Sequence, residues 1–477
     1  MLRKRLAFVL VGALLITGWL LMARKPARAS SFVVDSHFDD SSAGDVNPGD
    51  CICADIFGAC TLRAAIQEAN ACSGIDTITF SQAMTITIDT TVGVLPSLDE
   101  QVTIDASGVW DTMNDMPGVM IDGDGGSFTG LYLGAGMCEV YGLSIVNFGG
   151  NGITVVSSAN QIGGTGFGQR NVLSGNDIGL VLTSTSTKLN AVYNNYLGLT
   201  GDGSAGHANV NGLYIGGGAS SNTVGGNGVN QANFIAGNTS DGIMIEGSGT
   251  DNNAIIGNAI GLASDMIKDL GNGGHGIRVQ NGPSNTIIGD SRSGNIIGYN
   301  STSGVYIYNA GSGMEVADNL IGSNVTDGIT IHNASGCIIT DNIISSNTLA
   351  GVRVVGASAF GNLVWPNSIY DNGGKGILLQ NGGNMGIASP VITSASSSGA
   401  SGTACNSCRV ALYSDSSDEG QIYHDILWAD ASGDWSYTGS LAGPNLTATV
   451  LDGSGNTSEF SAPHSILEKV YLPLVRK

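Results

Sequence analysis

Charged residues and aromatic rings are both scarce in this chain of 477 residues. Asp, Glu, Lys and Arg together make up 12% of the sequence, and Phe, Trp and Tyr make up 6%. Lys and Arg number only 18 against 39 Asp and Glu, which gives a net charge of −21. Contacts to nucleic-acid phosphates or to an anionic membrane need clustered basic side chains. The composition therefore excludes nucleic acid as a partner and favours glycans, cations or other proteins.

After the first 30 residues the chain also lacks any apolar run long enough to span a membrane. The one such run, Leu6–Met22, follows the basic residues 3–5 and precedes the small-x-small sequence of residues 27–29. This pattern predicts a signal peptide over residues 1–29, with an uncleaved membrane anchor as the alternative. Cleavage leaves 12 basic and 39 acidic residues, a net charge of about −27. We therefore expect a secreted or cell-surface protein, acting as a monomer.

Proline is also sparse, with 10 residues, whereas glycine reaches 73 and hydrophobic residues 42%. That balance indicates many tight turns between short buried strands rather than disorder. The stretch 327–347, DGITIHNASGCIITDNIISSN, shows the unit. It holds three short apolar runs separated by Asn and Gly turns, with period-two alternation at Ile329 and Ile331. Three such strands bury a core only when the same unit is stacked on both sides.

Two markers repeat along the chain and show that the unit is stacked. A glycine followed by alternating apolar residues recurs at Gly152, Gly179, Gly212, Gly242, Gly276, Gly304, Gly328, Gly351 and Gly376. The motif Asn-x-(Ile/Leu)-x-x-Asn begins at Asn171, Asn233, Asn295, Asn319, Asn342 and Asn367, with variants at Asn195 and Asn258. Regular units take 23 to 25 residues, and longer ones carry insertions such as 200–210 and 263–273. These intervals predict an all-β fold, a right-handed parallel β-helix (solenoid) over residues 76–388, rather than a leucine-rich repeat.

The segment 30–75 is predicted to cap the first open coil. Residues 61–70 form the best helix of the mature chain, with Thr61 as N-cap and one apolar face. Four cysteines lie nearby, and the spacing leaves two disulfide pairings open, 51–60 with 53–72 or 51–72 with 53–60; metal binding is a less favoured alternative.

The sequence CTLRAAIQEANA at 60–71, followed by GIDTITF at 74–80, resembles the CSLREA-type N-terminal domain of secreted bacterial parallel β-helix proteins. Thr61 and Ala64 replace the Ser and Glu of the motif. The resemblance extends through the repeats to about residue 390. It implies a right-handed parallel β-helix and carries no established catalytic residues.

Inside the coils, we expect Ile329 and Ile331 and their counterparts to face the core. We predict an amide ladder at one turn, formed by Asn281, Asn309, Asn333 and Asn381. Cys138 and Cys337 occupy one slot of the unit, seven rungs and about 34 Å apart, so we expect two buried free thiols.

The outward residues of the first strand suggest a glycan-binding surface, because aromatic rings lie beside polar groups that suit sugar hydroxyls. One column contains Tyr214, Met244, Arg278, Tyr306, Thr330 and Arg353, and the next contains Glu246, Gln280, Tyr308 and His332. The candidate ligand-binding residues are Tyr214, Glu246, Arg278, Tyr306, Tyr308, His332 and Arg353. Outward tyrosines also pack well on any pleated sheet, which is the structural alternative.

Catalytic signals are weak. The sequence Gly274-His275-Gly276 echoes a polygalacturonase motif, but the slot of His275 holds ordinary turn residues in other coils, and the adjacent Asp pair of those hydrolases is missing. Asp318 and Asp341 occupy equivalent positions on adjacent rungs, where they would share a cation such as Ca²⁺, although two acids are few ligands for it. We therefore expect no catalytic residues, no structural metal and no required cofactor.

From about residue 389 the pattern changes to short alternating strands at 390–392, 409–413, 435–437, 446–450 and 455–461. They predict an immunoglobulin-like β-sandwich over 389–463, similar to small modules that end many secreted bacterial repeat proteins. Cys405 and Cys408 are expected to form a local disulfide. An apolar tail, 464–477, follows, either as a sorting or docking signal or as an added strand.

These features predict a secreted or cell-surface β-helix protein that binds or adheres to an extracellular glycan or cell-envelope polymer without catalysis. The alternative is a polysaccharide lyase or glycoside hydrolase acting on acidic polysaccharide. A purely structural envelope component is the third hypothesis.

Overall fold

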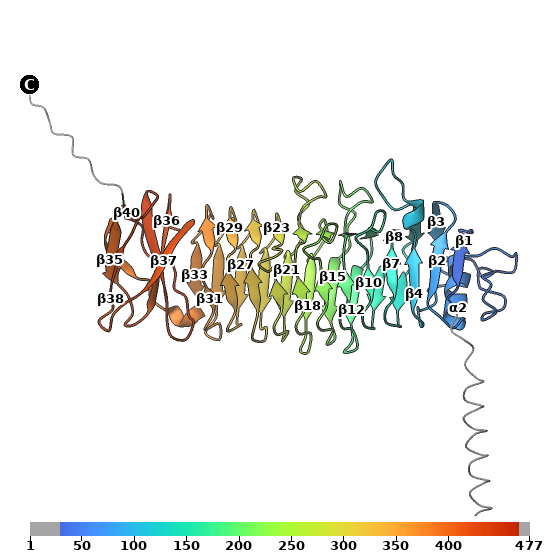
Figure 1. Ribbon diagram of the computed structural model, residues 1–477, viewed down its shortest axis with the longest axis horizontal. Helices are drawn as coiled ribbons and strands as arrows, with labels where there is room; N and C mark the ends of the chain where they lie inside the picture. The colour runs from blue at the N-terminus through green and yellow to red at the C-terminus, as the bar shows by residue number, and fades with distance from the viewer. Residues whose placement is uncertain (1–28, 467–477) are drawn as a thin grey trace, which may run out of the picture.

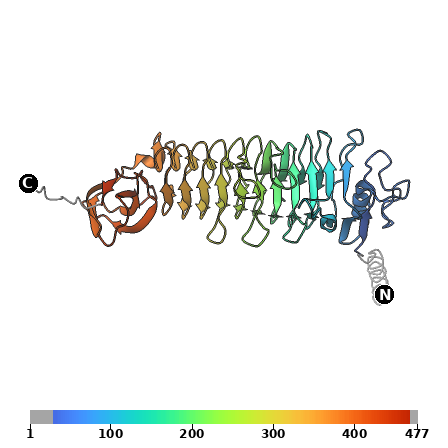
Figure 2. The same ribbon diagram turned by 90° about the horizontal axis from the view of Figure 1, so that it is seen from above.

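The computed structural model describes residues 29–466, which form a right-handed β-helix of three long parallel sheets followed by an antiparallel β region (Figure 1). Figure 2 shows the coils stacked in one line between the N-terminal cap and the C-terminal region. The predicted fold class is confirmed. The predicted signal peptide, apart from Ala29, and residues 467–477 of the predicted tail lie outside the described residues.

Each coil contributes one strand to each sheet. The 12-stranded sheet contains β1 (Ser31–Val34), β2 (Asp76–Phe80), β4 (Val102–Asp105), β7 (Glu139–Tyr141), β10 (Gln161–Ile162), β13 (Ala191–Val192), β16 (Thr223–Val224), β19 (Ala254–Ile255), β22 (Ile287–Ile288), β25 (Glu315–Ala317), β28 (Ile338–Thr340) and β31 (Leu363–Val364). The 11-stranded sheet contains β3 (Met84–Thr87), β5 (Val119–Asp122), β8 (Leu143–Val146), β11 (Asn171–Ser174), β14 (Asn195–Leu197), β17 (Phe234–Ile235), β20 (Ala259–Ile260), β23 (Ile296–Gly298), β26 (Leu320–Gly322), β29 (Ile343–Ser345) and β32 (Ser368–Tyr370). The ten-stranded sheet contains β6 (Leu131–Leu133), β9 (Ile153–Val155), β12 (Ile178–Thr183), β15 (Asn211–Gly216), β18 (Ile243–Glu246), β21 (Ile277–Gln280), β24 (Val305–Tyr308), β27 (Ile329–His332), β30 (Val352–Val355) and β33 (Ile377–Gln380).

Alternating residues of the solenoid strands enter one continuous core. Ile329 and Ile331 of β27 are fully buried and pair in register with Val305 and Ile307 of β24. At about 25 cal/mol per Å² of apolar surface, these stacked aliphatic columns are the main stabilising contribution of each coil. Two short 3₁₀ helices, η1 (Ser107–Val109) and η2 (Gly383–Gly386), interrupt the pattern.

Asparagine ladders run along three corners of the coil, but not along the predicted one. Two ladders hold eight residues each. The first contains the first asparagine of the Asn-x-(Ile/Leu)-x-x-Asn motif; the second contains the last asparagine of the motif in six coils, and Asn209 and Asn272, which lie in the insertions, in the other two. The two ladders are Asn171, Asn195, Asn233, Asn258, Asn295, Asn319, Asn342 and Asn367, and Asn176, Asn209, Asn238, Asn272, Asn300, Asn324, Asn347 and Asn372. A shorter ladder joins Asn160, Asn190, Asn222 and Asn253.

The ladder predicted at Asn281, Asn309, Asn333 and Asn381 is wrong. These residues have positive φ angles between 46° and 61°, in the left-handed region that Asn tolerates. Their side chains point outward: Asn281 donates to Glu246, and Asn333 accepts from Ser358. Asn is favoured at this turn for its backbone, whereas the ladders need an amide that points inward.

The N-terminal cap consists of α2 (Leu62–Ala71) and a loop held by two disulfides. Thr61 is the N-cap and accepts a hydrogen bond from the backbone of Ala64, as predicted. Cysteine pairs 51–72 and 53–60 form the disulfides, which selects one of the two predicted pairings. Within the cap, Arg63 of α2 forms a buried ion pair of 2.7 Å with Asp39. The segment also supplies β1, the first strand of the 12-stranded sheet.

The C-terminal region consists of two antiparallel sheets that share one core. One sheet contains β34 (Val391–Ser396), β35 (Gly399–Thr403) and β38 (Asp434–Thr438), and the other contains β37 (Ile422–Trp428), β36 (Arg409–Asp415), β39 (Asn445–Leu451) and β40 (His464–Ser465). Trp435 from the first sheet packs with Val410 and Leu446 from the second. The expected disulfide between Cys405 and Cys408 is present. The Ig-like class of this region stays a prediction.

Residues 455–461 do not form the predicted strand of this region; they cover the last coil of the solenoid. Asn456 accepts from the backbone of Gly361, Thr457 from that of Val364 and Glu459 from that of Leu379. Open strand ends favour pairing with other chains. Residues 455–461 therefore supply the hydrogen-bond partners that the last coil would otherwise lack.

Cys138 and Cys337 are buried free thiols, as predicted. Each precedes a strand of the 12-stranded sheet, β7 and β28, and the two strands are seven rungs apart. Burial raises the pKa of Cys337 to about 12.

Candidate functional site

The outer face of the ten-stranded sheet carries the two predicted columns of side chains. The strand register places Tyr214, Met244, Arg278, Tyr306, Thr330 and Arg353 in one column and Glu246, Gln280, Tyr308 and His332 in the next. The predicted placement of the columns is therefore confirmed, because the alternation of each strand and its turn glycine fix the register. Whether the columns bind a ligand stays a prediction.

An aromatic cluster occupies the centre of this face on β24 and its neighbours. Tyr306 stacks on His275, with ring centroids 4.5 Å apart and an interplanar angle of 9°, and lies parallel to Tyr308 at 6.1 Å. The Tyr306 hydroxyl is 3.1 Å from Nδ1 of His332, at hydrogen-bond distance. His332 also meets Tyr308 edge to face at 5.1 Å. We call these four residues, His275, Tyr306, Tyr308 and His332, the ring cluster.

An arginine–aspartate ion pair lies on each side of the ring cluster. Nη2 of Arg278 is 2.7 Å from Oδ2 of Asp241, and Arg353 pairs in the same way with Asp327. Both aspartates are buried, with side-chain exposures of 2% and 1%, whereas the arginines remain 28% and 29% exposed. Each arginine is therefore held in place by a buried carboxylate and keeps part of its guanidinium accessible.

The two ion pairs repeat one local construction. Each aspartate precedes the strand glycine of its coil, and each also accepts a backbone N–H from the turn of the next coil, that of His275 at 2.8 Å or Ala350 at 3.1 Å. The arginine belongs to that next coil as well. The ion pairs thus join β18 to β21 and β27 to β30, with β24 between them.

Burial shifts several pKa values in this site. It lowers the pKa of His275 to about 4, and the nearby Arg278 contributes in the same direction, so the imidazole is neutral at pH 7. Burial also raises the pKa of Asp241, although the His275 backbone and Arg278 oppose that shift. Burial raises the pKa of Tyr306 too, with a smaller contribution from Tyr308. His275 and Tyr306 are therefore both uncharged at neutral pH.

Thr330 was expected to be accessible, and this expectation is wrong. Its side chain is 2% exposed; its hydroxyl donates to Asp327 at 2.8 Å and lies 3.0 Å from the hydroxyl of Ser303. The larger neighbours on either rung, Tyr306 and Arg353, leave no room for a short side chain to reach solvent. Thr330 therefore supports the Asp327–Arg353 pair instead of forming part of the surface.

The remaining predicted residues lie toward the N-terminal end of the same face. Glu246 accepts hydrogen bonds from Gln280 at 3.1 Å and from Asn281 at 3.2 Å. Tyr214 is two rungs from Arg278, separated by Met244. Its ring lies over Gly216, where an added Cβ would fall 2.2 Å from the hydroxyl oxygen. Glycine at this position therefore lets the tyrosine lie flat along the sheet.

Taken one coil at a time, the sequence does not indicate the participation of Asp241, Asp327 and His275, because the slot before the strand glycine is typical of an ordinary turn. A signal was available for the aspartates. In both cases an Asp directly before the strand glycine is followed, one coil later, by an Arg in the outward column. The stacking of His275 on Tyr306 has no such signal, because it depends on the direction that the ring takes from its turn.

Metal ligands do not gather on this face. Within residues 29–466 the one group of three potential ligands is Cys51, Glu68 and Cys72, and its two cysteines are disulfide-bonded to each other. Asp318 and Asp341 do lie on adjacent rungs at the end of β25 and β28, and burial raises the pKa of Asp318, with a smaller contribution from Asp341. Two carboxylates alone are few ligands for Ca²⁺, which takes about six to eight oxygens.

The chemistry available here is contact with an extended polar ligand. Flat rings, an amide, a carboxylate and two partly exposed guanidinium groups lie along strands about 4.8 Å apart. Aromatic faces pack against apolar C–H surfaces, while Arg, Gln and Glu bond to hydroxyl groups. Across residues 29–466, no helix is long and apolar enough to cross a membrane.

Residues 211–416 match the family model described as right handed beta helix region. No curated protein matches the chain. The family match begins after the N-terminal cap, so the CSLREA-type resemblance of that cap stays a prediction.

Several solved structures are similar in fold. The Dettilon tailspike protein shares 13% identity at a TM-score of 0.42, covering 88% of this chain and 78% of that chain. Pectate lyase Pel9A shares 13% identity at a TM-score of 0.35, with 72% and 80% covered. The A-module of Azotobacter vinelandii mannuronan C-5 epimerase AlgE4 shares 16% identity at a TM-score of 0.30, with 72% and 81% covered. Similarity at this level concerns the fold and carries no argument about activity.

Proposed function

We propose that the protein binds a polysaccharide along the outer face of the ten-stranded sheet. The observation that supports this proposal is the ring cluster, held between two arginines that buried aspartates fix in place. Tyr306 and Tyr308 present parallel rings on one strand, and His332 offers a polar edge beside them. Such rings suit the C–H face of a pyranose, and the surrounding polar groups suit its hydroxyls.

The charge balance of this surface favours neutral or weakly charged sugars. Arg278 and Arg353 are each paired with an aspartate, and Glu246 adds a further negative charge. Since the whole chain is also acidic, a long polyanionic chain would be repelled from this face. The ligand we propose is therefore an extracellular glycan or cell-envelope polymer, bound by a secreted or cell-surface chain.

Retention on immobilised polysaccharides tests this proposal. The protein is passed over a panel of neutral and acidic polysaccharides, and retention of the native chain is compared with that of a Tyr306→Ala/Tyr308→Ala variant. We expect retention on at least one glycan and a loss of about tenfold or more in the variant. Leu320→Ala/Ile343→Ala is the matched control. Both residues are 43% exposed, and both lie on the 11-stranded sheet, away from the ring cluster.

Two results would contradict the proposal. Equal retention of both double variants would show that the ring cluster does not hold the glycan. No retention on any polysaccharide would favour the hypothesis of a purely structural envelope component.

Cleavage of an acidic polysaccharide is the second candidate, and the Tyr306–His332 hydrogen bond favours it. In β-elimination a base removes the C5 proton, the C4–O4 bond breaks, and an acid protonates O4 as the C4–C5 double bond forms. A histidine and a tyrosine at 3.1 Å are suitable for these roles, and Arg278 or Arg353 would face the substrate carboxylate. New absorbance from the unsaturated uronate, lost in Tyr306→Phe and His332→Ala, would establish cleavage and overturn the non-catalytic proposal.

A further inference from the structure

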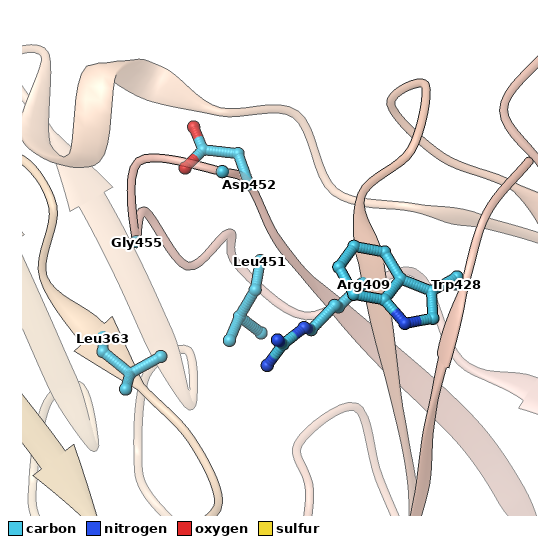
Figure 3. A pocket seen from close by; sticks show the side chains of 7 residues that line it. Leu363, Arg409, Trp428, Leu451, Asp452 and Gly455 are labelled. Atoms are coloured by element: carbon cyan, nitrogen blue, oxygen red, sulfur yellow. The ribbon is translucent and has the colours of Figure 1, made fainter. Parts of the chain in front are cut away.

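A separate pocket of about 410 Å³ lies where the C-terminal region meets the last strand of the 12-stranded sheet (Figure 3). Leu363 of β31 lines one side. Arg409, Trp428 and Leu451, which are side by side at one end of β36, β37 and β39, line the other. Asp452, Gly453 and Gly455 complete the lining. The volume lies within the range of about 300–1,000 Å³ that is usual for small-molecule sites.

Arg409 differs from the other arginines of the described chain. Arg63, Arg170, Arg278, Arg292 and Arg353 each lie within 4.0 Å of a carboxylate. Among residues 29–466, Arg409 is the one arginine without an ion pair, and its guanidinium is instead 4.9 Å from the ring centroid of Trp428. Figure 3 shows this guanidinium ending beside Leu451, with Leu363 farther along on the opposite side of the pocket. The pocket therefore contains an unneutralised cation in a chain that is otherwise strongly acidic.

The acid in the lining, Asp452, does not form an ion pair with this cation. Oδ1 of Asp452 accepts the backbone N–H groups of Ser454 at 2.8 Å and Asn456 at 2.9 Å, and Oδ2 accepts from Nδ2 of Asn456 at 2.8 Å. These bonds fix the carboxylate to its own turn. Arg409 is thus left free to pair with an anion that enters from solvent.

The rest of the pocket is apolar. Trp428 is 65% exposed, an unusual position for the largest apolar side chain. Leu451 forms part of the floor, and Leu363 continues an outward column that includes Ile338 on the preceding rung, which is 41% exposed. A ligand that fits must therefore combine one anionic group with an apolar face.

We propose that this pocket binds an acidic sugar residue, with its carboxylate on Arg409 and its C–H face against Trp428 and the two leucines. A planar guanidinium pairs with a carboxylate through two parallel N–H donors, and stacking on Trp428 holds that fork in a fixed plane. The inference rests on the proposed function only in taking the ligand to be a sugar. It adds a subsite for a charged residue, separate from the ring cluster and at the junction with the C-terminal region.

Calorimetric titration of the native chain with trigalacturonic acid tests the proposal, with an uncharged trisaccharide as the comparison. We expect trigalacturonate to bind at least tenfold more tightly than the uncharged probe. Arg409→Gln should lose about tenfold or more in affinity, and Trp428→Ala should weaken binding as well. Arg292→Gln is the matched control, because it removes an exposed arginine from the solenoid that is already paired with Asp290.

Three outcomes would overturn the proposal: no binding of trigalacturonate, unchanged binding in Arg409→Gln, or equal competition by acetate, which would show a simple anion site. The Tyr306→Ala/Tyr308→Ala variant separates this inference from the proposed function. It should lose polysaccharide retention and still bind trigalacturonate at the pocket. If Arg409→Gln has no effect while the tyrosine variant loses retention, the pocket proposal fails and the proposed function stands.

Discussion

The carboxylate of Glu419 accepts hydrogen bonds from both the backbone and the side-chain N–H groups of Asn372, each at 3.1 Å. Asn372 is the last asparagine of an eight-residue ladder, so a buried acid from the C-terminal region ends that column. Burial raises the pKa of Glu419 to about 7, although the bonds from Asn372 oppose the shift.

The burial of Glu419 predicts that the junction becomes less stable as the pH rises toward 7. The pKa of Glu419 in the folded chain lies above that of an unfolded Glu, about 4.3, so the folded chain binds more protons between these values. The free energy of unfolding therefore falls as pH increases through this window. We expect the Tm to be about 2–5 °C lower at pH 8 than at pH 5.5. Glu419→Gln should flatten this slope, whereas Glu315→Gln, on the outer face of β25, should keep it.

The asparagine ladders should be sensitive to single substitutions. Asn319 donates to Asn342 at 2.9 Å and accepts from both N–H groups of Asn295 at 2.9 Å, all in the buried corner. Asn319→Ala leaves those donors without an acceptor, so we expect a loss of about 2–4 kcal/mol in thermal or urea unfolding followed by circular dichroism. Asn309→Gly, at an exposed turn with φ of 46°, is the control and should change stability by less than about 0.5 kcal/mol. A similar loss in both variants would contradict the ladder assignment.

Removal of a buried aspartate beside the ring cluster should also be costly. Asp327 accepts hydrogen bonds from the Thr330 hydroxyl and the Ala350 backbone, and it forms an ion pair with Arg353. Asp327→Asn should cost about 1–3 kcal/mol, limited by the freedom of Arg353 to turn toward solvent. Asp290→Asn, whose partner Arg292 is 71% exposed, should cost less than about 1 kcal/mol. Urea or thermal unfolding curves give the free energy of unfolding of both variants. An equal decrease in the two would refute the supporting role of Asp327.

The thiol count offers a direct check of the disulfides. Of the 8 cysteines, six form the pairs 51–72, 53–60 and 405–408, and Cys138 and Cys337 are buried and free. A thiol reagent should therefore label no cysteine in the native chain and two after denaturation without reductant. Rapid labelling of the native chain would show that Cys138, before β7, or Cys337, before β28, is accessible to solvent.

The sequence predicted more of the fold than of the site. Alternation with period two around Gly328 or Gly276 determines which strand residues face the core, and the repeat length determines which residues share a column. That residues 455–461 provide the cover over the last coil could not be foreseen, because they alternate like a strand while their partners lie about 90 residues earlier in the chain.

The position of the asparagine ladders could not be predicted from the sequence either. The sequence shows the Asn-x-(Ile/Leu)-x-x-Asn motif as a repeat marker, but predicts the amide ladder at the turn of Asn333 instead. Both positions favour Asn, one for its inward amide and the other for its left-handed backbone. Only the direction of the side chain separates the two, and composition does not report it.

By itself the sequence determined the stacked coil, its register and the outward columns that contain Arg278 and Tyr306, because local periodicity fixes which side of a strand a residue occupies. Only the tertiary structure decided which outward groups are free. It pairs Arg278 and Arg353 with buried aspartates, covers Thr330, stacks His275 on Tyr306 and leaves Arg409 unpaired beside Trp428. The physical reason is that these contacts join neighbouring coils or separate regions, where side-chain length and direction, rather than sequence spacing, determine what can touch.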